Sequence, residues 1–325
     1  MRYKELFKYK ILRFKCYSKL LILYIITLFS SLGCSQGQFP LQTNDDSFLT
    51  KQTSNTPENS KIPVGLQKFS LPQMVEGILR KREYFVRFPL KPSRLNYPIV
   101  FYFHGKGSTA YRFFKSLREV QKLIDNNHFI GIFPQGYKKS WNLNHEPSKA
   151  DDSAWVKEIL EEIAKLGFVD SSSVYAVGIS NGAGFVNKLG KETDFFKGIA
   201  PIVSQQTIEM FKMSPPRGIS VFQVNGDNDP LIPLEGGLSR TSHRFVSALE
   251  SAENWALHSD CKKVPTALED FWGPYRVKGF VYDECESGRQ VRYHIVEGSG
   301  HKSNFKGFPF HTIIWNFFKN FSGDE

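Results

Sequence analysis

The clearest chemical signal in the sequence is Ser180, within SVYAVGISNGAG over residues 173–184. An apolar run ends at Gly178, and Gly178, Ser180 and Gly182 form a G-x-S-x-G pattern. Between a strand and a helix, this pattern is typical of a tight turn that lifts a serine hydroxyl above the edge of a sheet. Side chains larger than hydrogen would not fit beside the serine. The pattern predicts that Ser180 is a nucleophile, with a structural turn as the alternative.

A serine nucleophile needs a histidine base and a carboxylate that orients the base. The candidate acids, Asp227 and Asp229, follow the predicted strand GISVFQVNG at residues 218–226. Active-site residues of open sheets gather at such strand ends. We predict that Asp229, which precedes Pro230, is the acid and that Asp227 caps the loop; the reverse assignment is the alternative.

The predicted base is His301, in EGSGHKSN directly after the predicted strand 291–298. The surrounding glycines leave room for an imidazole to reach over the edge of the sheet. The other histidines considered lie inside a strand, begin a helix, fall in a polar region or precede the nucleophile: His294, His311, His243, His258 and His104. We expect His104 to shape its own loop rather than to act as a base.

Two backbone N–H groups are candidates for stabilising a developing oxyanion. One belongs to Asn181, at the start of the helix that follows Ser180, where N–H groups have no partner within the helix. The other belongs to Lys106, in the loop FHGKGS at residues 103–108, with the N–H groups of its neighbours as the alternative. We therefore predict an oxyanion hole formed by Asn181 and Lys106.

Apolar and amphipathic stretches alternate from about residue 70 onward. Continuous apolar runs predict strands covered on both faces, and helical spacing predicts the covering helices. The predicted strands are 82–89, 97–105, 129–136, 173–179, 198–204, 218–226 and 291–298, and the predicted helices are 111–127, 153–167, 184–192 and 310–321. Such alternation predicts an α/β fold with a mostly parallel central sheet and helices on both faces.

The first 33 residues have the features of an export signal. They carry seven Lys or Arg and one acid, followed by the apolar run LLILYIITLFSSL at residues 20–32. Gly33-Cys34 resembles the cleavage site of a bacterial lipoprotein. We therefore predict that residues 1–33 are removed and that Cys34 carries a lipid; an ordinary signal peptide and an uncleaved anchor are the alternatives.

Residues 34–70 are predicted to form a flexible polar tether, and residues 71–325 the catalytic domain. The stretch 35–61 is rich in Ser, Thr, Asn, Gln and Pro and has little periodicity. Of the formal charge of +10, the signal accounts for +6, which leaves +4 for the rest of the chain. This balance gives little support to a nucleic-acid partner.

Cys261 and Cys285 remain once Cys16 in the signal and Cys34 are set aside. In an oxidising compartment they could form one disulfide, and two buried thiols are the alternative. Neither CxxC nor HExxH occurs in the sequence. We therefore expect no metal site, and the serine chemistry needs no organic cofactor.

Several segments, taken in order, resemble the extracellular esterases of the polyhydroxybutyrate depolymerase and feruloyl/acetylxylan esterase group, carbohydrate esterase family one. The resemblance covers about residues 82–320 and rests on FHGKGS, FPQGYKKSWN, DDSAWVKEIL, FVDSSSVYAVGISNGAGF, FFKGIAPIVS, NGDNDPLIPLEGG, WALHSDC and GSGH. It implies an α/β-hydrolase fold, a catalytic triad of Ser180, Asp229 and His301, and a disulfide between Cys261 and Cys285.

The sequence departs from the family pattern at the border of the expected site. Lys302-Ser303 stand where Trp-Pro often follows the histidine, and Leu234-Glu235 stand where Tyr often precedes Gly-Gly. Lys106 replaces the usual Cys or Gly after His-Gly. These changes bear on the substrate rather than on the triad.

Aromatic side chains could form a platform for an acyl or sugar group, although most aromatic residues are core residues. The candidates are Trp141, Trp155, Phe185, Trp272 and Tyr275, with Trp141 in the SWN stretch preferred. Asp152, near a predicted helix start, is expected to be a cap or a buried hydrogen-bond partner rather than a catalyst.

Together these features predict an exported serine esterase that acts through an acyl-enzyme. We expect it to be lipid-anchored to the bacterial cell envelope, and a periplasmic or secreted protein is the alternative. The expected substrates are carboxylic esters, polymeric ones included: polyhydroxyalkanoate, feruloyl or acetyl carbohydrate esters. The alternatives are a surface lipoprotein that keeps the fold for ligand binding, and a peptidase or thioesterase on the same fold. Membrane contact is expected through the lipid anchor only, and the sequence does not fix the oligomeric state.

Overall fold

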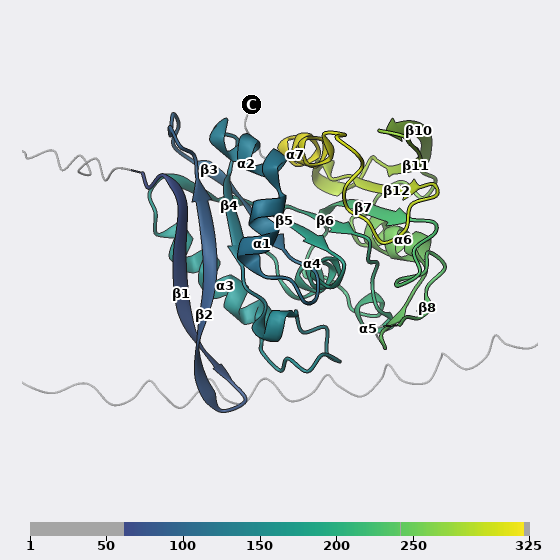
Figure 1. Cartoon of the computed structure of the whole chain (residues 1–325). Coiled ribbons are helices and arrows are strands. Elements are labelled where there is room, and N and C mark those ends of the chain that lie inside the picture. The colour runs from purple at the N-terminus through teal and green to yellow at the C-terminus, as the bar shows by residue number, and fades with distance from the viewer. Residues whose placement is uncertain (1–61, 241, 322–325) are drawn as a thin grey trace, which may run out of the picture. The chain divides into compact units, whose positions relative to one another are not determined.

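The computed structural model describes residues 62–240 and 242–321 (Figure 1). Parallel strands in this part of the chain are β3 (Tyr97–Phe103), β4 (Ile130–Pro134), β5 (Val169–Ile179), β6 (Gly198–Ile202), β7 (Ser220–Gly226) and β12 (Val291–Val296). Antiparallel hairpins flank them: β1 (Gly65–Val75) with β2 (Ile78–Phe88), and β10 (Thr266–Trp272) with β11 (Tyr275–Tyr282). All belong to one sheet, in the order β1-β2-β4-β3-β5-β6-β7-β12-β11-β10.

Helices cover both faces of this sheet. One face packs against α3 (Asp152–Ala164), α4 (Asn181–Glu192) and α6 (Ala248–His258). The other packs against α1 (Ala110–Ser116), α2 (Arg118–Asp125) and α7 (Phe310–Lys319). Short elements α5 (Ile208–Phe211), β8 (Gly237–Leu238) and β9 (Arg244–Phe245) lie in the connections, together with 3-10 turns at Tyr137–Lys139 and Glu286–Gly288. The predicted sheet with helices on both faces is confirmed.

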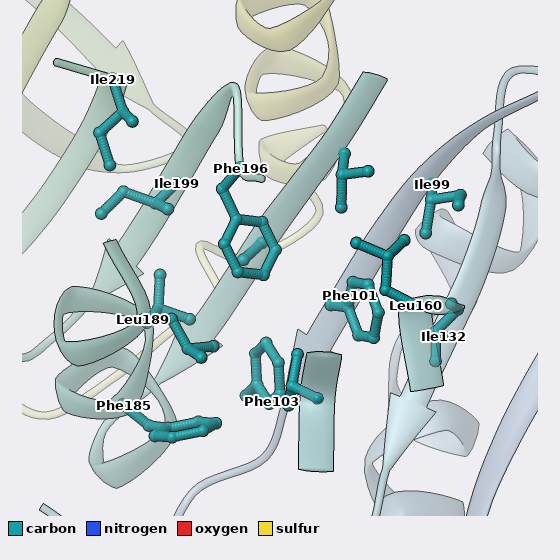
Figure 2. Packing of buried hydrophobic residues seen from close by; sticks show 14 of the residues in the cluster. Ile99, Phe101, Phe103, Ile132, Leu160, Phe185, Leu189, Phe196, Ile199 and Ile219 are labelled. Carbon is teal, nitrogen blue, oxygen red and sulfur yellow. The ribbon is translucent and has the colours of Figure 1, made fainter. Parts of the chain in front are cut away.

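Residues of β3 show why both faces are covered. Phe101 and Phe103 point into the core under α3 and α4, whereas Tyr102 points into the core under α7. Figure 2 shows Phe103 beside Phe185 of α4, and their ring centroids are 5.2 Å apart. This packing seats the first turns of α4 against the sheet, where Ser180 begins the helix.

The predicted helix over residues 111–127 is two helices. Leu117 separates α1 from α2 with φ −92° and ψ 59°, which is not a helical conformation. Because Leu117 is itself buried, the apolar spacing continues across the break and hides it from the sequence. The other predicted helices and strands are present, with ends shifted by a few residues.

The boundary predicted between tether and domain at residue 70 is wrong. Residues 65–70 already lie in β1, paired with β2 from Gly65 opposite Phe88 onward. β1 is an edge strand whose side chains are mostly exposed or half-buried, so its polar composition resembles that of a linker. Exposure also explains why β10, with two acids among its exposed residues, was not predicted.

The predicted signal segment, Cys34 and the stretch up to residue 61 lie outside the described residues. Within residues 62–240 and 242–321, no helix is long and apolar enough to cross a membrane.

Candidate active site

Ser180 lies at the sharp turn between β5 and α4. Its backbone has φ 58° and ψ −120°, a conformation that a non-glycine residue keeps only where surrounding contacts enforce it. A Cβ added at Gly178 would collide with the carbonyl oxygen of Gly182, and one added at Gly182 would collide with that of Phe103. The glycines are therefore required by close backbone approach, as the G-x-S-x-G pattern predicts.

Ser180, His301 and Asp229 form one hydrogen-bonded chain. Ser180 Oγ lies 2.7 Å from His301 Nε2, and His301 Nδ1 lies 2.7 Å from Asp229 Oδ2. The three residues follow β5, β12 and β7, so they meet at the carboxyl edge of the parallel strands. With Nδ1–H donating to the carboxylate, Nε2 is free to accept the proton of the Ser180 hydroxyl.

Asp229 is buried and holds three hydrogen bonds. Its Oδ1 accepts the backbone N–H groups of Leu231 at 2.8 Å and Ile232 at 3.0 Å, in addition to the His301 contact at Oδ2. Burial raises the pKa of Asp229, but the hydrogen bonds from His301, Ile232 and Leu231 together bring it below its ordinary value. The carboxylate is therefore ionised at neutral pH and suited to orient an imidazole.

Asp227, the alternative acid, occupies a different position. Its Oδ1 accepts the backbone N–H of Gly298 at 2.7 Å. This bond joins the loop after β7 to the loop after β12 and so helps to place His301 near Asp229. Asp227 thus has the loop-capping position that the sequence predicts.

The loop after β3 passes directly beside Ser180, the predicted nucleophile. A Cβ added at Gly105 would lie 3.5 Å from the Cβ of Ser180, and Lys106 is the next residue. The N–H groups of Gly107 and Ser108 donate to backbone carbonyls, whereas among the described residues the N–H of Lys106 has no acceptor. Lys106 and Asn181, the first residue of α4, therefore offer backbone N–H groups next to Ser180.

His104 holds this loop in place and is not a base. Its Nδ1 lies 2.9 Å from the carbonyl oxygen of Gly105, and its Nε2 accepts the N–H of Gly136 at 3.1 Å. Burial lowers the pKa of His104 to about 4, so the ring is neutral at physiological pH. Burial has the same effect on His294 and His311, whose pKa values also fall to about 4.

The prediction that Trp141 forms a substrate platform is wrong. Its side chain is 0% exposed, and its Nε1 donates to the carbonyl oxygen of His104 at 2.8 Å. Its ring stacks on that of Phe185 with centroids 5.0 Å apart. Trp141 therefore lies in the core and helps to hold the loop after β3 in place. Trp155 and Trp272 are buried too, while Tyr275 is half-buried against Phe305.

Asp152 is a buried hydrogen-bond partner, as expected. Its Oδ1 pairs with Arg82 Nη2 at 2.7 Å, and its Oδ2 accepts the N–H of Asn142 at 2.8 Å. Asp151 supplies the helix cap instead, since its side chain accepts the N–H of Ala154. The Arg82–Asp152 pair ties β2 to the start of α3, well within the core.

The sequence did not indicate that polar side chains pack behind the turn at Ser180. The Asn181 Oδ1 accepts the backbone N–H of Trp141 at 2.7 Å, and its Nδ2 donates to Glu146 Oε1 at 3.2 Å. Glu146 is buried beside His243, although it stands in the polar stretch NHEPSK. Nothing in the composition of that stretch distinguishes a buried glutamate from a solvated one.

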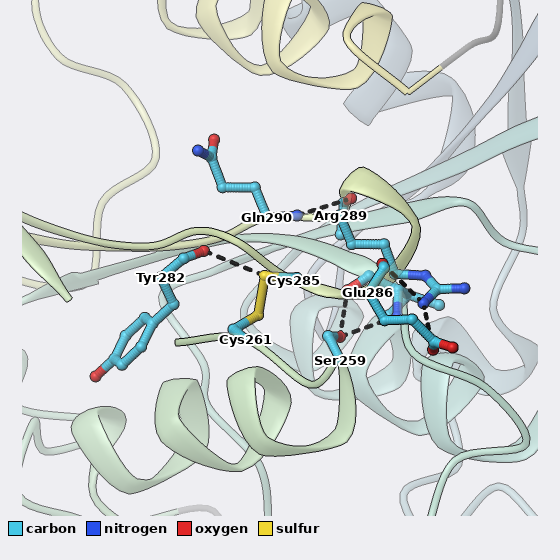
Figure 3. Close-up of a disulfide and its surroundings, with 9 residues drawn as sticks. Ser259, Cys261, Tyr282, Cys285, Glu286, Arg289 and Gln290 are labelled. Carbon is cyan, nitrogen blue, oxygen red and sulfur yellow. Dashed lines mark hydrogen bonds and ion pairs between the residues drawn. A yellow bond between two sulfur atoms is a disulfide. The ribbon is translucent and has the colours of Figure 1, made fainter. Parts of the chain in front are cut away.

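No metal-binding cluster is present in the part of the chain that the structure describes. No group of three or more His, Cys, Asp or Glu side chains there is arranged to hold an ion. The sulfur atoms of Cys261 and Cys285 are joined in a disulfide, as predicted, so the alternative of two buried thiols is wrong (Figure 3).

Comparison with known proteins identifies esterases among the relatives of the chain, while no family model matches it. It is 24% identical to feruloyl esterase B of Piromyces equi over 69% of this chain and 42% of that protein. It is 23% identical to a bifunctional acetylxylan esterase/xylanase of Neocallimastix patriciarum over 72% of this chain and 33% of that protein. The chain thus spans less than half the length of these two relatives.

A solved structure adds to the sequence comparison. The acetyl xylan esterase from Aspergillus awamori superposes with a TM-score of 0.55 and 14% identity, over 78% of this chain and 99% of that one. Likeness at such low identity concerns the fold and not the activity. Together with the mostly parallel sheet and its flanking helices, it shows that the chain has the α/β-hydrolase fold.

Proposed function

We propose that this protein is a serine hydrolase that cleaves carboxylic ester bonds. The observation that carries the proposal is the chain of contacts from Ser180 Oγ through His301 to Asp229, with both distances at 2.7 Å, on a strained strand-to-helix turn. A structural turn would need neither the imidazole nor the buried carboxylate. The same geometry weighs against a binding protein that merely keeps the fold.

Each residue then has a definite role. Ser180 Oγ attacks the carbonyl carbon of the ester while His301 Nε2 accepts its proton. The N–H groups of Asn181 and Lys106 donate to the oxyanion of the tetrahedral intermediate. His301 returns the proton to the leaving alcohol, and an acyl-enzyme forms. A water molecule, deprotonated by His301, releases the acid and regenerates Ser180. Asp229 holds the imidazole tautomer throughout.

The names of the relatives narrow the substrates to test first. Relatives that act as feruloyl and acetylxylan esterases favour phenolic or acetyl esters of carbohydrates. Polyhydroxyalkanoates remain in the proposed range because of the segment resemblance. The departures at Lys302-Ser303 and Leu234-Glu235 border the triad, and we propose that they set the preference among these esters.

The experiment compares the wild type with Ser180→Ala on para-nitrophenyl acetate, para-nitrophenyl butyrate and methyl ferulate. Loss of the nucleophile should reduce kcat by about three orders of magnitude or more. The wild type, but not the variant, should also be labelled by a fluorophosphonate probe. Equal rates on all three esters, or labelling that survives the substitution, would contradict the proposal and favour a non-catalytic ligand-binding role.

We also propose that the protein is exported and anchored by a lipid at Cys34. The basic and apolar start of the chain supports export, and the Cys261–Cys285 disulfide fits an oxidising compartment. Cys34→Ala should move the protein from the membrane fraction to the soluble fraction of cells that process lipoproteins. Mass spectrometry of the mature N-terminus would distinguish a lipidated cysteine from an ordinary cleaved end.

A further inference from the structure

Two buried ionisable side chains connect the residue after the nucleophile to two separate loops. Glu146 Oε1 accepts from Asn181 Nδ2 at 3.2 Å and lies 2.9 Å from His243 Nε2. Glu146 belongs to the connection between β4 and α3, and His243 to the connection between β8 and β9. Glu146 is 2% exposed and His243 4% exposed, so neither is placed to touch a substrate.

The Glu146 carboxylate is ionised and accepts a hydrogen bond at each of its two oxygens. Its second oxygen, Oε2, accepts the backbone N–H of Leu143 at 2.6 Å. Burial raises the pKa of Glu146, but the contact with His243 and the backbone hydrogen bonds, including that of Leu143, together bring it below its ordinary value. A charged acceptor forms stronger hydrogen bonds than a neutral one of the same geometry, so the charge on Glu146 favours the bond from Asn181 Nδ2 at 3.2 Å.

The Asn181 amide is held from both ends. Its Oδ1 accepts the backbone N–H of Trp141 at 2.7 Å, and its Nδ2 donates to the backbone carbonyl of Trp141 at 3.1 Å as well as to Glu146. Rotating the amide by half a turn would place donor against donor and acceptor against acceptor. The side chain therefore has one orientation, and it restrains the backbone that follows Ser180.

Burying a carboxylate beside an imidazole tends to lower the stability of the folded state, so the two groups are expected to serve another purpose. Apolar residues of similar volume are often as stable or more so, because removing charges from water carries a large penalty. An oxyanion donor, in contrast, must be held within a few tenths of an ångström of its position to be effective. A polar clamp on Asn181 meets that requirement.

We propose that Glu146 and His243 are positioning residues that act through Asn181, whose backbone N–H they hold in place for the oxyanion. This inference rests on the proposed function, in which that N–H stabilises the tetrahedral intermediate. Because such an intermediate differs from the bound ester chiefly at this oxygen, loss of the clamp lowers kcat and leaves KM nearly unchanged.

The test is a double-mutant cycle on the full-length protein with para-nitrophenyl butyrate. Glu146→Gln keeps the shape of the side chain but turns one acceptor into a donor, so at least one of its contacts is lost. We expect kcat to fall about tenfold, a fraction of the effect of removing a whole oxyanion donor. In an Asn181→Ala background the same substitution should change kcat less than twofold, because the residue through which it acts is already truncated.

Asn254→Ala is the matched control. It removes another buried polar contact of α4, the bond from Lys191 Nζ to Asn254 Oδ1 at 2.7 Å, at the far end of the helix from Ser180. It should lower the melting temperature as Glu146→Gln does but leave kcat unchanged. If Glu146→Gln does not fold, His243→Phe takes its place in the cycle, because it keeps a ring but removes both ring nitrogens, including the Nε2 that faces Glu146.

Two results would overturn the inference. One is an unchanged kcat in a folded Glu146→Gln or His243→Phe protein; the other is an equal fall in kcat in both the wild-type and Asn181→Ala backgrounds. Neither result bears on Ser180, whose role is judged by loss of activity and labelling in Ser180→Ala. Failure of the clamp and failure of the esterase proposal are therefore distinguishable.

Discussion

Two neighbouring residues at the carboxyl edge of the sheet have unusual backbone conformations. Ser180 has φ 58°, and Val203, a β-branched residue for which this region is especially rare, has φ 53°. Each is held by the adjacent strand: Ser180 N–H donates to the Ile202 carbonyl at 3.0 Å, and Val203 N–H donates to the Val224 carbonyl at 2.8 Å. The sheet ladder thus enforces the strained turn that presents the serine.

The two aspartates after β7 offer a matched pair for testing the triad. Asp229→Asn removes the charge that holds the His301 tautomer and should lower kcat by about three to four orders of magnitude. Asp227→Asn alters only the bond to Gly298 and should lower kcat less than about threefold. Steady-state kinetics of both variants on one ester gives the fall in kcat that each substitution causes. Equal losses in the two would contradict the assignment of Asp229.

Trp141 separates support of the site from contact with substrate. Trp141→Phe removes the hydrogen bond to the His104 carbonyl and leaves that buried oxygen without its partner, which should cost about 1–3 kcal/mol of stability. Because the ring is inaccessible, the ratio of kcat/KM for acetate and butyrate esters should not change. Urea unfolding and a two-substrate assay check both parts. A changed acyl preference at unchanged stability would restore Trp141 as a platform.

These residues show what the sequence can and cannot indicate. The contacts among Ser180, Asp229 and His301 could be predicted because a catalytic triad restricts residue type and chain order, and because glycines mark the turn at Ser180. The burial of Trp141 and Glu146 could not be predicted, since it depends on how the loop after β4 folds back onto α4. A tryptophan near the site looks like a platform, and a glutamate in a polar stretch looks solvated, until the packing is known.

At the scale of elements, the sequence indicates the buried central strands of the sheet more clearly than its edge strands. The strands β3, β4 and β6 are continuous apolar runs because both of their faces are covered, and β7, although fully buried, also contains Ser220, Gln223 and Asn225. The edge hairpins β1–β2 and β10–β11 expose one side and carry charged residues, so their patterns are mixed. The break at Leu117 escaped prediction because the buried stripe runs across both helices.

The nucleophile turn tolerates no side chain at Gly178. Gly178→Ala should destabilise the protein by about 3 kcal/mol or more, because the new Cβ meets backbone atoms of Gly182 that cannot move without unwinding α4. Gly167→Ala is the control, since an added Cβ there has no atom within 4 Å. Thermal unfolding compares the two. A Gly178→Ala protein as stable as the control would show that the turn relaxes easily.

Lys191, in the last turn of α4, gives stability a pH dependence. Burial lowers its pKa to about 7 from an ordinary 10.5. Between these values the unfolded chain binds more protons than the folded one, so the free energy of unfolding rises with pH through this group. Lys191→Met should remove that rise between pH 7 and 9, whereas Lys157→Met on the surface of α3 should not. Urea unfolding at pH 7 and at pH 9 gives the free energy of unfolding at each pH. If this free energy changes equally between the two pH values in the wild type and in Lys191→Met, the prediction is wrong.

At the scale of the whole molecule, the candidate active site is assembled from loops far apart in the sequence. Ser180, Asp229 and His301 meet only after β5, β7 and β12 are aligned in one parallel sheet. The three side chains can meet only if the strands that carry them lie in the correct order in the sheet.

The disulfide strengthens this assembly without taking part in the chemistry. Cys261 follows α6 and Cys285 follows β11, so the bond closes a loop of 24 residues around the edge hairpin (Figure 3). In the chain-entropy model, a loop of this size contributes about 3 kcal/mol by restricting the unfolded chain. Backbone bonds also hold this region, among them Glu286 N–H to the Ser259 carbonyl at 3.0 Å.

Replacing both cysteines with alanine should therefore lower the free energy of unfolding by about 3 kcal/mol. Because Glu286 and Ser259 still join the two ends, the folded state keeps its shape and kcat should stay within about twofold of the wild-type value. Urea unfolding with and without a reductant measures the first effect, and the reductant should destabilise the wild type but not the variant. A large loss of kcat in a folded variant would mean that the edge hairpin, through β12, controls the position of His301.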